Sequence, residues 1–278
     1  MFVRYCGSYL IKDLEKLRLS VSKATDFNDP FELHLTPGPP LTRNQAKQSF
    51  ETVKKRESFQ RSIMRKKGLK TISQLKRHLR THRQHYINTL IVRQPELIQT
   101  NRDQIWEVMD DSARVMCFAK VKDKDPVEIP MWGYYGSGHT GIRLHVSENF
   151  FKRDGRSTFE MVYSANPPVL DLSLDPLGEE YFEFSRKLLR YKSDAWKHED
   201  ETRLLIYPQK CVTEKDSNDH DREFVRISVS DITRIDLGVK FDAKRIDEAL
   251  KLKNVYPDLE VYRATKSGSG YYIDYTKI

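Results

Sequence analysis

The arrangement of apolar and polar positions divides the chain into a strand-rich body and an internal helical segment. Short apolar runs with alternation predict strands over residues 1–5, 17–21, 115–119, 141–146, 159–163, 202–207, 223–227, 232–237 and 259–262. Helical spacing predicts helices over residues 10–16, 130–135, 179–191 and 243–253. Because the strands come from both ends of the chain, we expect one α+β domain, residues 1–278, with a mixed, mainly antiparallel sheet at its core.

A helical insertion is expected within this domain, over residues 38–101. The apolar positions of its first predicted helix, residues 42–64, are Ala46, Phe50, Val53, Phe59 and Ile63. Gly68 ends that pattern, and Ser73 is the expected N-cap of a second helix that runs to about residue 92. A third helix is expected over residues 101–114, with Ile105, Trp106 and Met109 on one face.

The positive charge of the chain is concentrated in the same region. The formal net charge is +8, yet residues 41–105 contain 16 Lys and Arg against 4 Asp and Glu, a net +12, so the rest carries −4. Such a segment attracts polyanions, above all the phosphates of RNA or DNA. An acidic protein partner, such as an antitoxin, and a helical cap with a solvated basic face remain alternatives. The candidate nucleic-acid-binding residues are Arg61, Arg65, Lys66, Lys67, Lys76, Arg77, Arg80 and Arg83.

Composition predicts a folded protein of the cytoplasm. Apolar residues make up 38% of the chain, charged residues 32% and aromatic residues 11%, which excludes a disordered chain. No apolar run approaches the roughly 18 residues of a membrane span, so no membrane partner is expected. The first residues lack the pattern of a secretory signal. Cys6, Cys117 and Cys211 are widely spaced and odd in number, as expected for reduced thiols.

A pair of acids in front of a predicted strand is the first candidate for chemistry. The motif Trp196-Lys197-His198-Glu199-Asp200-Glu201-Thr202-Arg203 runs directly into an apolar strand. Because side chains alternate along a strand, Glu199 and Glu201 are expected to project to one side, with Arg203 two positions further on. Such a pair suits general-base chemistry or the binding of a ribose or a cation. A surface ladder of salt bridges would use the same residues, and both interpretations stay open.

A glycine-rich aromatic segment over residues 131–141 is the second candidate. Its four glycines allow the backbone to approach another strand or a ligand closely. Trp132, Tyr134, Tyr135 and His139 offer ring surfaces with polar tips, which suit a nucleobase or a nicotinamide ring. The glycine spacing fits neither the dinucleotide-binding motif nor the P-loop.

A tight turn and a histidine series complete the candidates. Residues 27–32, Phe-Asn-Asp-Pro-Phe-Glu, specify a turn because the position before proline leaves the helical region. Its two phenylalanines either anchor the turn on the core or line a ligand pocket. His78, His82 and His85 share one helical face and could hold a metal, but interleaved arginines are typical of a solvated basic face. We expect no metal there.

Several motifs together carry a resemblance to a known family. They are Arg4-Tyr5, Leu19-Ser20, residues 26–32, Met116-Cys117-Phe118-Ala119, residues 131–141, residues 196–203, Ile232-x-x-Ile235-x-x-Gly238 and Leu259-x-x-Tyr262-x-Ala264. In this order they resemble the bacterial family catalogued as domain of unknown function 2971, over the whole chain except the insertion. Ala119 stands where that family often has Ser, and Gly133-Tyr134 where it often has Ser-His. The resemblance implies an accessory, toxin or antiviral defence role in bacteria.

The order of the motifs also resembles, more distantly, the ADP-ribosyltransferase fold, whose split sheet surrounds NAD. This resemblance implies that Arg4, beside Tyr5, meets the nicotinamide ribose or a phosphate. Tyr134 or Tyr135 would stack on the nicotinamide. Glu201 would hold a ribose hydroxyl while the C–N bond stretches, and Glu199 would deprotonate the incoming nucleophile. The remaining residues expected around the cofactor are Trp132, His139 and Arg203.

Two functions of different class follow. The first is an NAD-using transferase with Glu201 and Glu199 as catalytic residues and no metal, acting on a nucleic acid or a protein. The second is a non-enzymatic nucleic-acid-binding module of a bacterial defence system, in which the acids are structural. A nuclease is a third interpretation, in which Glu199, Glu201 and Asp29 would hold a divalent metal ion, although no known nuclease spacing is present.

Overall fold

The computed structural model describes residues 2–27, 29–36, 41–93, 96, 103, 106–107, 109–122, 124–153, 155–169, 179–216 and 219–278. The chain divides into two compact units. Unit 1 comprises Met1–Pro30, Asp110–Tyr163 and Lys192–Ile278, and unit 2 comprises Phe31–Met109 and Ser164–Tyr191. The basic insertion therefore belongs to unit 2, together with a segment that the hydrophobic pattern assigned to the body.

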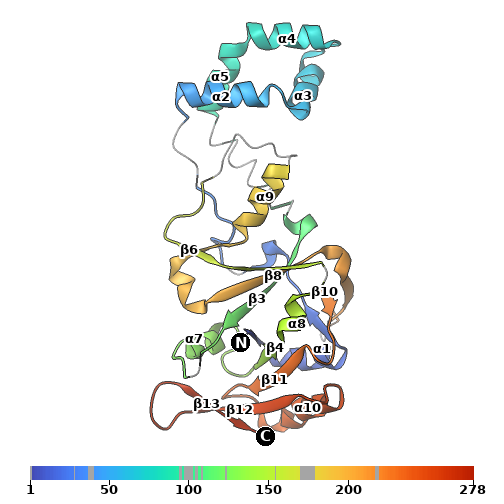
Figure 1. The fold of residues 1–278 in the computed structure, drawn as a ribbon, viewed down its shortest axis with the longest axis vertical. Helices are drawn as coiled ribbons and strands as arrows, with labels where there is room; N and C mark the ends of the chain where they lie inside the picture. The colour runs from blue at the N-terminus through green and yellow to red at the C-terminus, as the bar shows by residue number, and fades with distance from the viewer. Residues whose placement is uncertain are drawn as a thin grey trace. The chain divides into compact units, whose positions relative to one another are not determined.

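Unit 1 is built mainly of strands (Figure 1). They are β1 (Phe2–Cys6), β2 (Arg18–Ser20), β3 (Arg114–Lys120), β4 (Ile142–Val146), β5 (Arg156–Glu160), β8 (Glu201–Ile206), β9 (Cys211–Lys215), β10 (Asp221–Arg226), β11 (Ile232–Leu237), β12 (Glu260–Lys266) and β13 (Ile273–Lys277). Its α-helices are α1 (Ile11–Glu15), α7 (Glu128–Tyr134), α8 (Glu148–Phe151) and α10 (Ile246–Lys251). Its 3-10 helices are η1 (Ser8–Leu10), η2 (Ala24–Asp26), η3 (Asp194–Glu199), η4 (Pro208–Lys210), η5 (Ala243–Arg245) and η6 (Leu252–Asn254). β6 (Val162–Ser164) pairs with β7 (Tyr191–Ser193) where the chain leaves unit 1 and returns to it.

One sheet organises unit 1. Among the described residues it has eight strands in the order β13-β12-β11-β4-β1-β3-β8-β5. Only the β11–β12 pair in this sheet is parallel, and the other described pairs are antiparallel. A second sheet has the order β2-β10-β9. The prediction of an α+β fold with a mainly antiparallel sheet is confirmed.

The two faces of the large sheet differ in chemistry. β4 reads Ile-Arg-Leu-His-Val, and because side chains alternate, Ile142 and Leu144 project to one face while Arg143 and His145 project to the other. The register carries this division across the sheet. We call the second face the polar face; its side chains include Tyr5, Cys117, Arg143, His145, Arg203 and Asp236.

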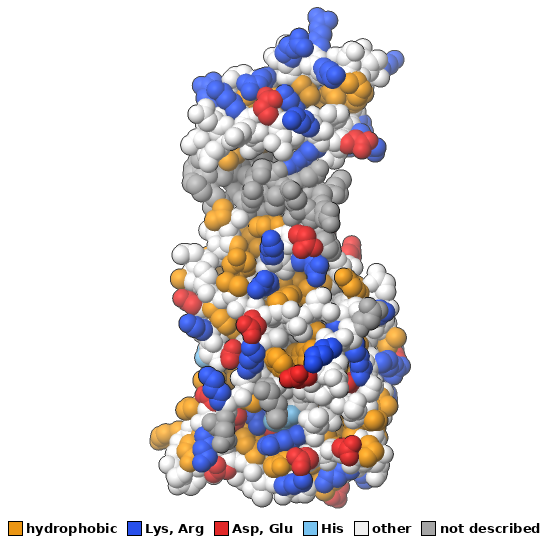
Figure 2. Space-filling view, viewed as in Figure 1, with side chains coloured by type: hydrophobic (Ala, Val, Ile, Leu, Met, Phe, Trp, Pro, Cys, Tyr) orange, Lys and Arg blue, Asp and Glu red, His pale blue; other side chains and the backbone are white. Residues whose placement is uncertain are grey.

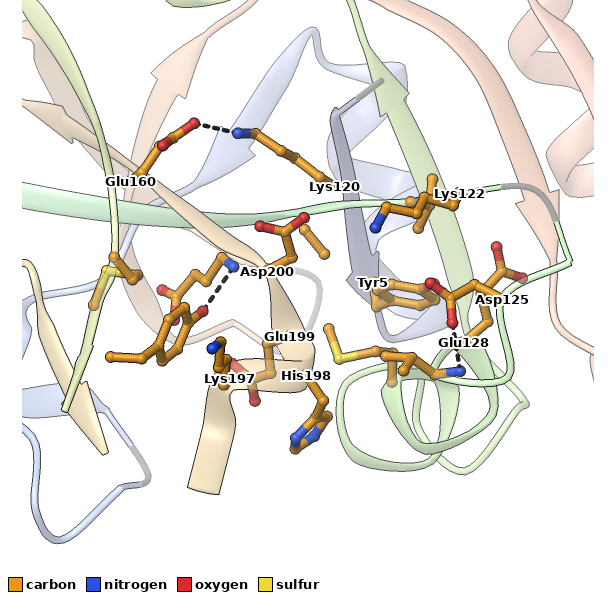
Figure 3. Close-up of a pocket in the computed structure, with 17 residues that line it drawn as sticks. Tyr5, Lys120, Lys122, Asp125, Glu128, Glu160, Lys197, His198, Glu199 and Asp200 are labelled. Atoms are coloured by element: carbon orange, nitrogen blue, oxygen red, sulfur yellow. Dashed lines mark hydrogen bonds and ion pairs between the residues drawn. The ribbon is translucent and has the colours of Figure 1, made fainter. Parts of the chain in front are cut away.

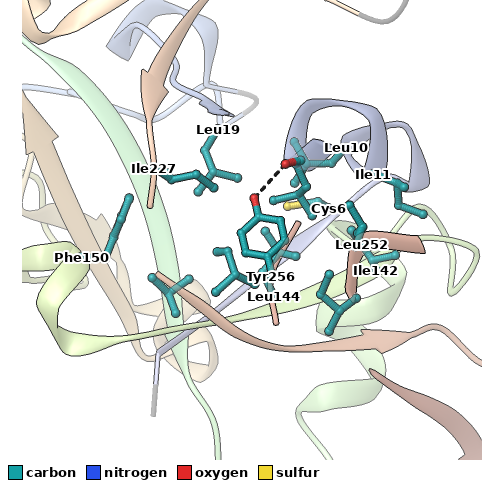
Figure 4. Packing of buried hydrophobic residues seen from close by; sticks show 14 of the residues in the cluster. Cys6, Leu10, Ile11, Leu19, Ile142, Leu144, Phe150, Ile227, Leu252 and Tyr256 are labelled. Carbon is teal, nitrogen blue, oxygen red and sulfur yellow. Dashed lines mark hydrogen bonds between the residues drawn. The ribbon is translucent and has the colours of Figure 1, made fainter. Parts of the chain in front are cut away.

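The opposite face forms the main hydrophobic core. Side chains from β1, β4 and β11 pack there against α1, α10 and the second sheet, with Leu144 and Leu19 fully buried (Figure 4). Tyr256 lies in this core, and its hydroxyl donates a hydrogen bond to the carbonyl oxygen of Leu14 at 2.8 Å. The hydroxyl group, which is buried away from water, therefore has a hydrogen-bond partner within the protein.

Unit 2 has its own helices and its own core. The helices whose bounds the structure describes are α2 (Arg43–Val53), α3 (Glu57–Lys67), α4 (Ile72–Thr81), α5 (Arg83–Val92) and α9 (Glu179–Leu188). α2 and α4 begin at capping boxes in which Thr42 pairs with Gln45 and Thr71 with Gln74. Gly68 ends α3 in the left-handed conformation, with φ 63°. A separate apolar cluster holds α2–α5 together and contains Ala46, Phe50, Ile63, Leu75, Leu79 and Ile87.

The structure corrects several expected boundaries in unit 2. The helix predicted over residues 42–64 is two helices, α2 and α3, and the helix predicted from Ser73 to residue 92 is also two, α4 and α5. The N-cap of α4 is Thr71 rather than Ser73, because the Thr71 hydroxyl accepts the Gln74 N–H. Within the helix predicted over residues 101–114, residues 101, 102, 104, 105 and 108 lie outside the described part of the chain. Residues 103, 106, 107 and 109–112 are helical, and Arg114 begins β3.

In unit 1, the departures concern individual strands. The pattern missed β7, β9 and β13, and it merged β5 with β6. In the expected turn, Asn28 lies outside the described residues. Phe31, the first residue of unit 2, is 66% exposed, so the interpretation that anchors both phenylalanines on the core does not hold for Phe31. None of the helices in the described part of the chain is long and apolar enough to cross a membrane.

One of the four glycines of residues 131–141 serves the packing of strands. A Cβ atom added to Gly141 would lie 2.1 Å from the carbonyl oxygen of Cys6 on β1, a distance that no side chain tolerates. Gly133, inside α7, would meet nothing within 4 Å. The close approach that the pattern predicted is therefore that of one strand to another at Gly141.

Substitution of these two glycines should change stability in opposite directions. We expect Gly141→Ala to lower the free energy of unfolding by about 3 kcal/mol, because the new methyl group forces β1 and β4 apart. Gly133→Ala should raise it by roughly 0.5–1 kcal/mol, since alanine favours a helix. Urea unfolding of both variants checks this, and equal effects of the two would contradict the close approach at Gly141.

Candidate functional site

A pocket of about 410 Å³ opens within unit 1, beside the polar face (Figure 3). β1, β3, α7 and the end of η3 contribute its walls. Its lining residues are Tyr5, Ala119, Lys120, Val121, Lys122, Asp125, Val127, Glu128, Met131, Glu160, Met161, Tyr163, Lys197, His198, Glu199, Asp200 and Glu201. Both acids of the sequence motif therefore reach the same cavity.

The two acids are held by one ammonium group. Glu199 ends η3 and Glu201 begins β8, and Asp200 between them adopts a left-handed conformation with φ 42° that Asp tolerates. Lys192 on β7 donates to Glu199 Oε2 at 2.5 Å and to Glu201 Oε2 at 2.8 Å. All three side chains are at least nine-tenths buried. A cation removed from water thus fixes the spacing of two carboxylates.

Arg203 completes the charge balance of this pair. Its Nε donates to Glu201 Oε1 at 2.7 Å, and the residue is 1% exposed. Its guanidinium also lies over the ring of Phe27, 4.8 Å from the ring centroid. Phe27 therefore packs on the guanidinium that pairs with Glu201.

Two tyrosines orient the carboxylates further. The Tyr135 hydroxyl donates to Glu199 Oε1 at 2.7 Å, and the Tyr163 hydroxyl accepts the backbone N–H of Glu201 at 2.8 Å. Burial, and then the charge of Glu199, raise the pKa of Tyr135 well above its usual range. Burial raises the pKa of Tyr163 to about 12. Both hydroxyls are protonated at neutral pH and act as hydrogen-bonding groups.

Glu201 is ionised at every physiological pH. Burial favours its neutral form, but the charges of Arg203 and Lys192 outweigh burial and hold the pKa of Glu201 at about 2. Burial would lower the pKa of Lys192, but the charges of Glu201 and Glu199 more than compensate and raise it. Such a carboxylate is a weak base, but it is a fixed negative charge in a site of low water content.

A thiol on the neighbouring strand faces the same acid. Cys117 lies opposite Arg203 in the register of β3 and β8, and it shares a hydrogen bond with Glu201. Burial and the charge of Glu201 raise the pKa of Cys117 well above its usual range. The thiol therefore remains protonated, which makes it a hydrogen-bond donor rather than a nucleophile.

A second buried network borders the pocket on the side of α7. Glu128 accepts from Arg143 Nη1 at 2.7 Å and from the Tyr275 hydroxyl at 2.6 Å. Arg143 also donates through Nε to Asp236 at 2.8 Å, and Asp236 contacts His145 Nε2 at 2.5 Å. Burial favours the neutral form of Asp236, but these partners lower its pKa to about 2.

The structure separates the residues that the sequence proposed for cofactor binding. Tyr5, Glu199 and Glu201 line the pocket, while Tyr135 and Arg203 contact the acids without lining it. Arg4 projects to the opposite face of the sheet, where its Nη1 donates to the Ser20 carbonyl at 2.9 Å. It therefore does not join the acid pair.

The remaining rings of residues 131–141 lie elsewhere. Trp132 is fully buried, stacks near His139 with ring centroids 6.4 Å apart, and donates from its indole N–H to Tyr275 at 3.1 Å. Tyr134 is 59% exposed and packs edge-on against Trp196. None of these is among the described residues that line the pocket.

Sequence reasoning missed the partners that make the site. Lys192 lies in a short strand without a clear hydrophobic pattern. Arg143 and Asp236 lie in β4 and β11, which were predicted as strands from their apolar residues. A charged residue at every second position of a buried strand was the available signal. It requires a charged partner inside the fold.

The histidine series of α4 and α5 is accounted for by contacts within unit 2. His78 Nε2 lies 3.0 Å from the Tyr86 hydroxyl, and its ring stacks on His82 with centroids 4.3 Å apart. Among the described residues, no three His, Cys, Asp or Glu side chains are grouped as they would be around a metal ion. No protein-family model, curated protein or solved structure matches the chain.

The depressed pKa of Glu201 predicts a specific pH dependence. Its pKa is about 2 in the folded state against about 4.5 when unfolded, so its contribution is complete above about pH 5 and is lost as the pH falls towards 2. We expect Glu201→Gln to destabilise the protein by roughly 3 kcal/mol at pH 7 and by progressively less below about pH 4. Urea unfolding as a function of pH measures this difference.

The exposed pair of Glu148 and Lys152 supplies the control. Its side chains are 79% and 70% exposed, so Glu148→Gln should leave stability within about 0.5 kcal/mol of wild type. A constant difference between Glu201→Gln and wild type down to about pH 3 would show that folding does not lower the pKa of Glu201.

Proposed function

We propose that unit 1 is a transferase that uses NAD as its donor, with the pocket holding the nicotinamide end of that molecule. The observation that supports this is the Glu201 carboxylate, a permanent negative charge in the pocket wall beside a second carboxylate. When the bond between C1′ of the ribose and the nicotinamide nitrogen breaks, nicotinamide leaves with the electron pair. The positive charge that develops on the ribose is stabilised by a preorganised anion.

The contacts of Glu201 support one role for it in this proposal. A carboxylate has about four sites for hydrogen bonds, so those from Arg203, Lys192 and Cys117 leave room for a ribose hydroxyl. Its low pKa suits charge stabilisation rather than proton removal. Glu199 faces the same cavity. It would take a proton from the acceptor while the nucleophilic atom of the acceptor forms its bond to C1′.

Other lining residues supply the remaining contacts. Tyr5 and Tyr163 offer ring surfaces for the nicotinamide. Lys122 and Lys197 are exposed on the lining and would meet the phosphates, the role that Arg4 cannot take from the other face of the sheet. The resemblance to domain of unknown function 2971 favours a toxin or defence effector as the setting for such a reaction.

A second candidate function is supported by the ion pairs themselves. Glu199 and Glu201 share one buried lysine, and a pair with these contacts would also serve as a purely structural element. The chain would then act without catalysis, as a nucleic-acid-binding module of a defence system. The two candidates differ in what happens to NAD.

Release of nicotinamide from NAD is the deciding measurement. The wild type should release nicotinamide and transfer the labelled ADP-ribose group to an acceptor when nucleic acid or lysate is supplied. Glu201→Gln should reduce the rate by about 10²–10³, the usual loss when one group that stabilises transition-state charge is removed. Label on protein or on nucleic acid identifies the acceptor.

A pair of tyrosine variants makes the test independent of folding. Tyr135→Phe removes the hydrogen bond to Glu199, and we expect it to slow nicotinamide release by about ten-fold while the fold persists. Tyr134→Phe alters an exposed neighbour and should leave the rate unchanged. Absence of NAD turnover by folded wild type, with every class of acceptor present, overturns the transferase proposal.

A further inference from the structure

Unit 2 presents cations on two neighbouring helices. Seven of the eight candidate residues are exposed, on α3 (Arg61, Arg65, Lys66, Lys67) and on α4 (Lys76, Arg77, Arg80). The buried positions of these helices are Ile63, Leu75 and Leu79, so the apolar side of each helix faces the core and the cations face solvent. Figure 2 shows Lys and Arg side chains gathered over these helices, at the top of the view. We call these seven residues the basic patch.

The cations of the two helices belong to one surface. Three effects lower the pKa of His78, in the middle of α4. The largest is burial, followed by the charge of His82 and by that of Lys67, in the last turn of α3. The end of α3 therefore lies beside α4. Within α4, Lys76 and Arg80 are four residues apart and share one side of the helix.

Few acids neutralise this surface. α4 contains no Asp or Glu, and the acid of α3, Glu57, pairs with Arg61, whose side chain is 77% exposed. Arg83 is set apart from the patch, because it is half-buried and pairs with Glu51 of α2 at 3.0 Å. Cations on adjacent turns of a helix repel one another and lower its stability. A bound polyanion would remove this repulsion.

The aromatic rings of these helices are committed to the core. Residues 41–93 contain Phe50, Phe59 and Tyr86 and no tryptophan. Phe50 is buried and stacks against Tyr86 with centroids 5.8 Å apart, and Phe59 packs edge-on against Tyr86. Proteins that hold single strands rely on exposed rings on which bases stack. The basic patch offers cations without such rings.

We propose that the basic patch binds double-helical nucleic acid through its phosphates, without reading its sequence. A helix of 11 residues is about 16 Å long, and that length of duplex carries about nine phosphate charges, a density that a single strand does not match. The patch supplies seven cations from two helices, each of about this length. The proposal stands on unit 2 alone and does not depend on NAD chemistry in unit 1.

Fluorescence anisotropy of the full chain with labelled oligonucleotides tests it. The probes are a duplex of about 20 base pairs, as DNA and as RNA, and each constituent single strand, titrated from about 50 to about 300 mM KCl. We expect the duplexes to bind about ten-fold or more tightly than the single strands, with affinity that falls steeply as salt rises. DNA and RNA duplexes bound alike support recognition of phosphate, and a preference identifies the natural form.

Two variants with the same change in charge locate the interface. Lys76→Gln, Arg77→Gln and Arg80→Gln together should weaken duplex binding by about ten-fold or more and reduce the slope of log K against log salt by about 3. Lys240→Gln, Lys244→Gln and Lys251→Gln remove the same charge from exposed positions of unit 1 and should change binding little. Circular dichroism verifies that both variants are folded.

Three results would overturn the proposal. The first is binding of single strands as tightly as duplexes, which would require a stacking surface. The second is equal weakening by both triple variants, which would reflect net charge rather than the basic patch. The third is binding of poly-glutamate in preference to either nucleic acid, which would identify an acidic protein as the partner.

Discussion

The polar face of the large sheet depends on charges that lose their water on folding. Lys192, Arg203 and Arg143 bring cations into the interior, and Glu199, Glu201 and Asp236 meet them with carboxylates at hydrogen-bond distance. An isolated buried charge costs several kcal/mol, so each group is tolerable only while its partner is in place. This constraint fixes the positions of side chains that could vary on a purely apolar face. As a result, the acids that line the pocket are held in defined orientations.

The same constraint links structure to the proposed chemistry. A carboxylate that keeps its charge inside a fold is costly to stability, and the structure offsets that cost with Lys192 and Arg203 rather than by protonating the acid. The pocket is thereby supplied with a permanent anion and with hydroxyl groups that stay protonated. Stability and the proposed reactivity depend on the same side chains, so both must be measured for each variant.

The two units divide the charge of the protein between two kinds of contact. In unit 1, cations and anions are paired inside the fold, beside the pocket. In unit 2, the cations of α3 and α4 face solvent over an apolar core that Phe50, Leu75 and Leu79 complete. An excess of exposed charge adds nothing to the core of a helical bundle, and this is the basis of the proposed binding of a polyanion.

The sequence by itself determined the elements whose pattern is local. β11 was predicted with its observed bounds, the strand after Glu201 was placed within one residue at either end, and the basic segment was found by counting charges. Only the tertiary structure decided which strands are neighbours and which charges meet. Lys192 contacts Glu201 from another strand, and Arg143 pairs with Asp236, which lies 93 positions later in the chain. Arg4 lies on the face of the sheet opposite the acids. Periodicity specifies that side chains alternate, but the order of strands in the sheet specifies which of them share a face.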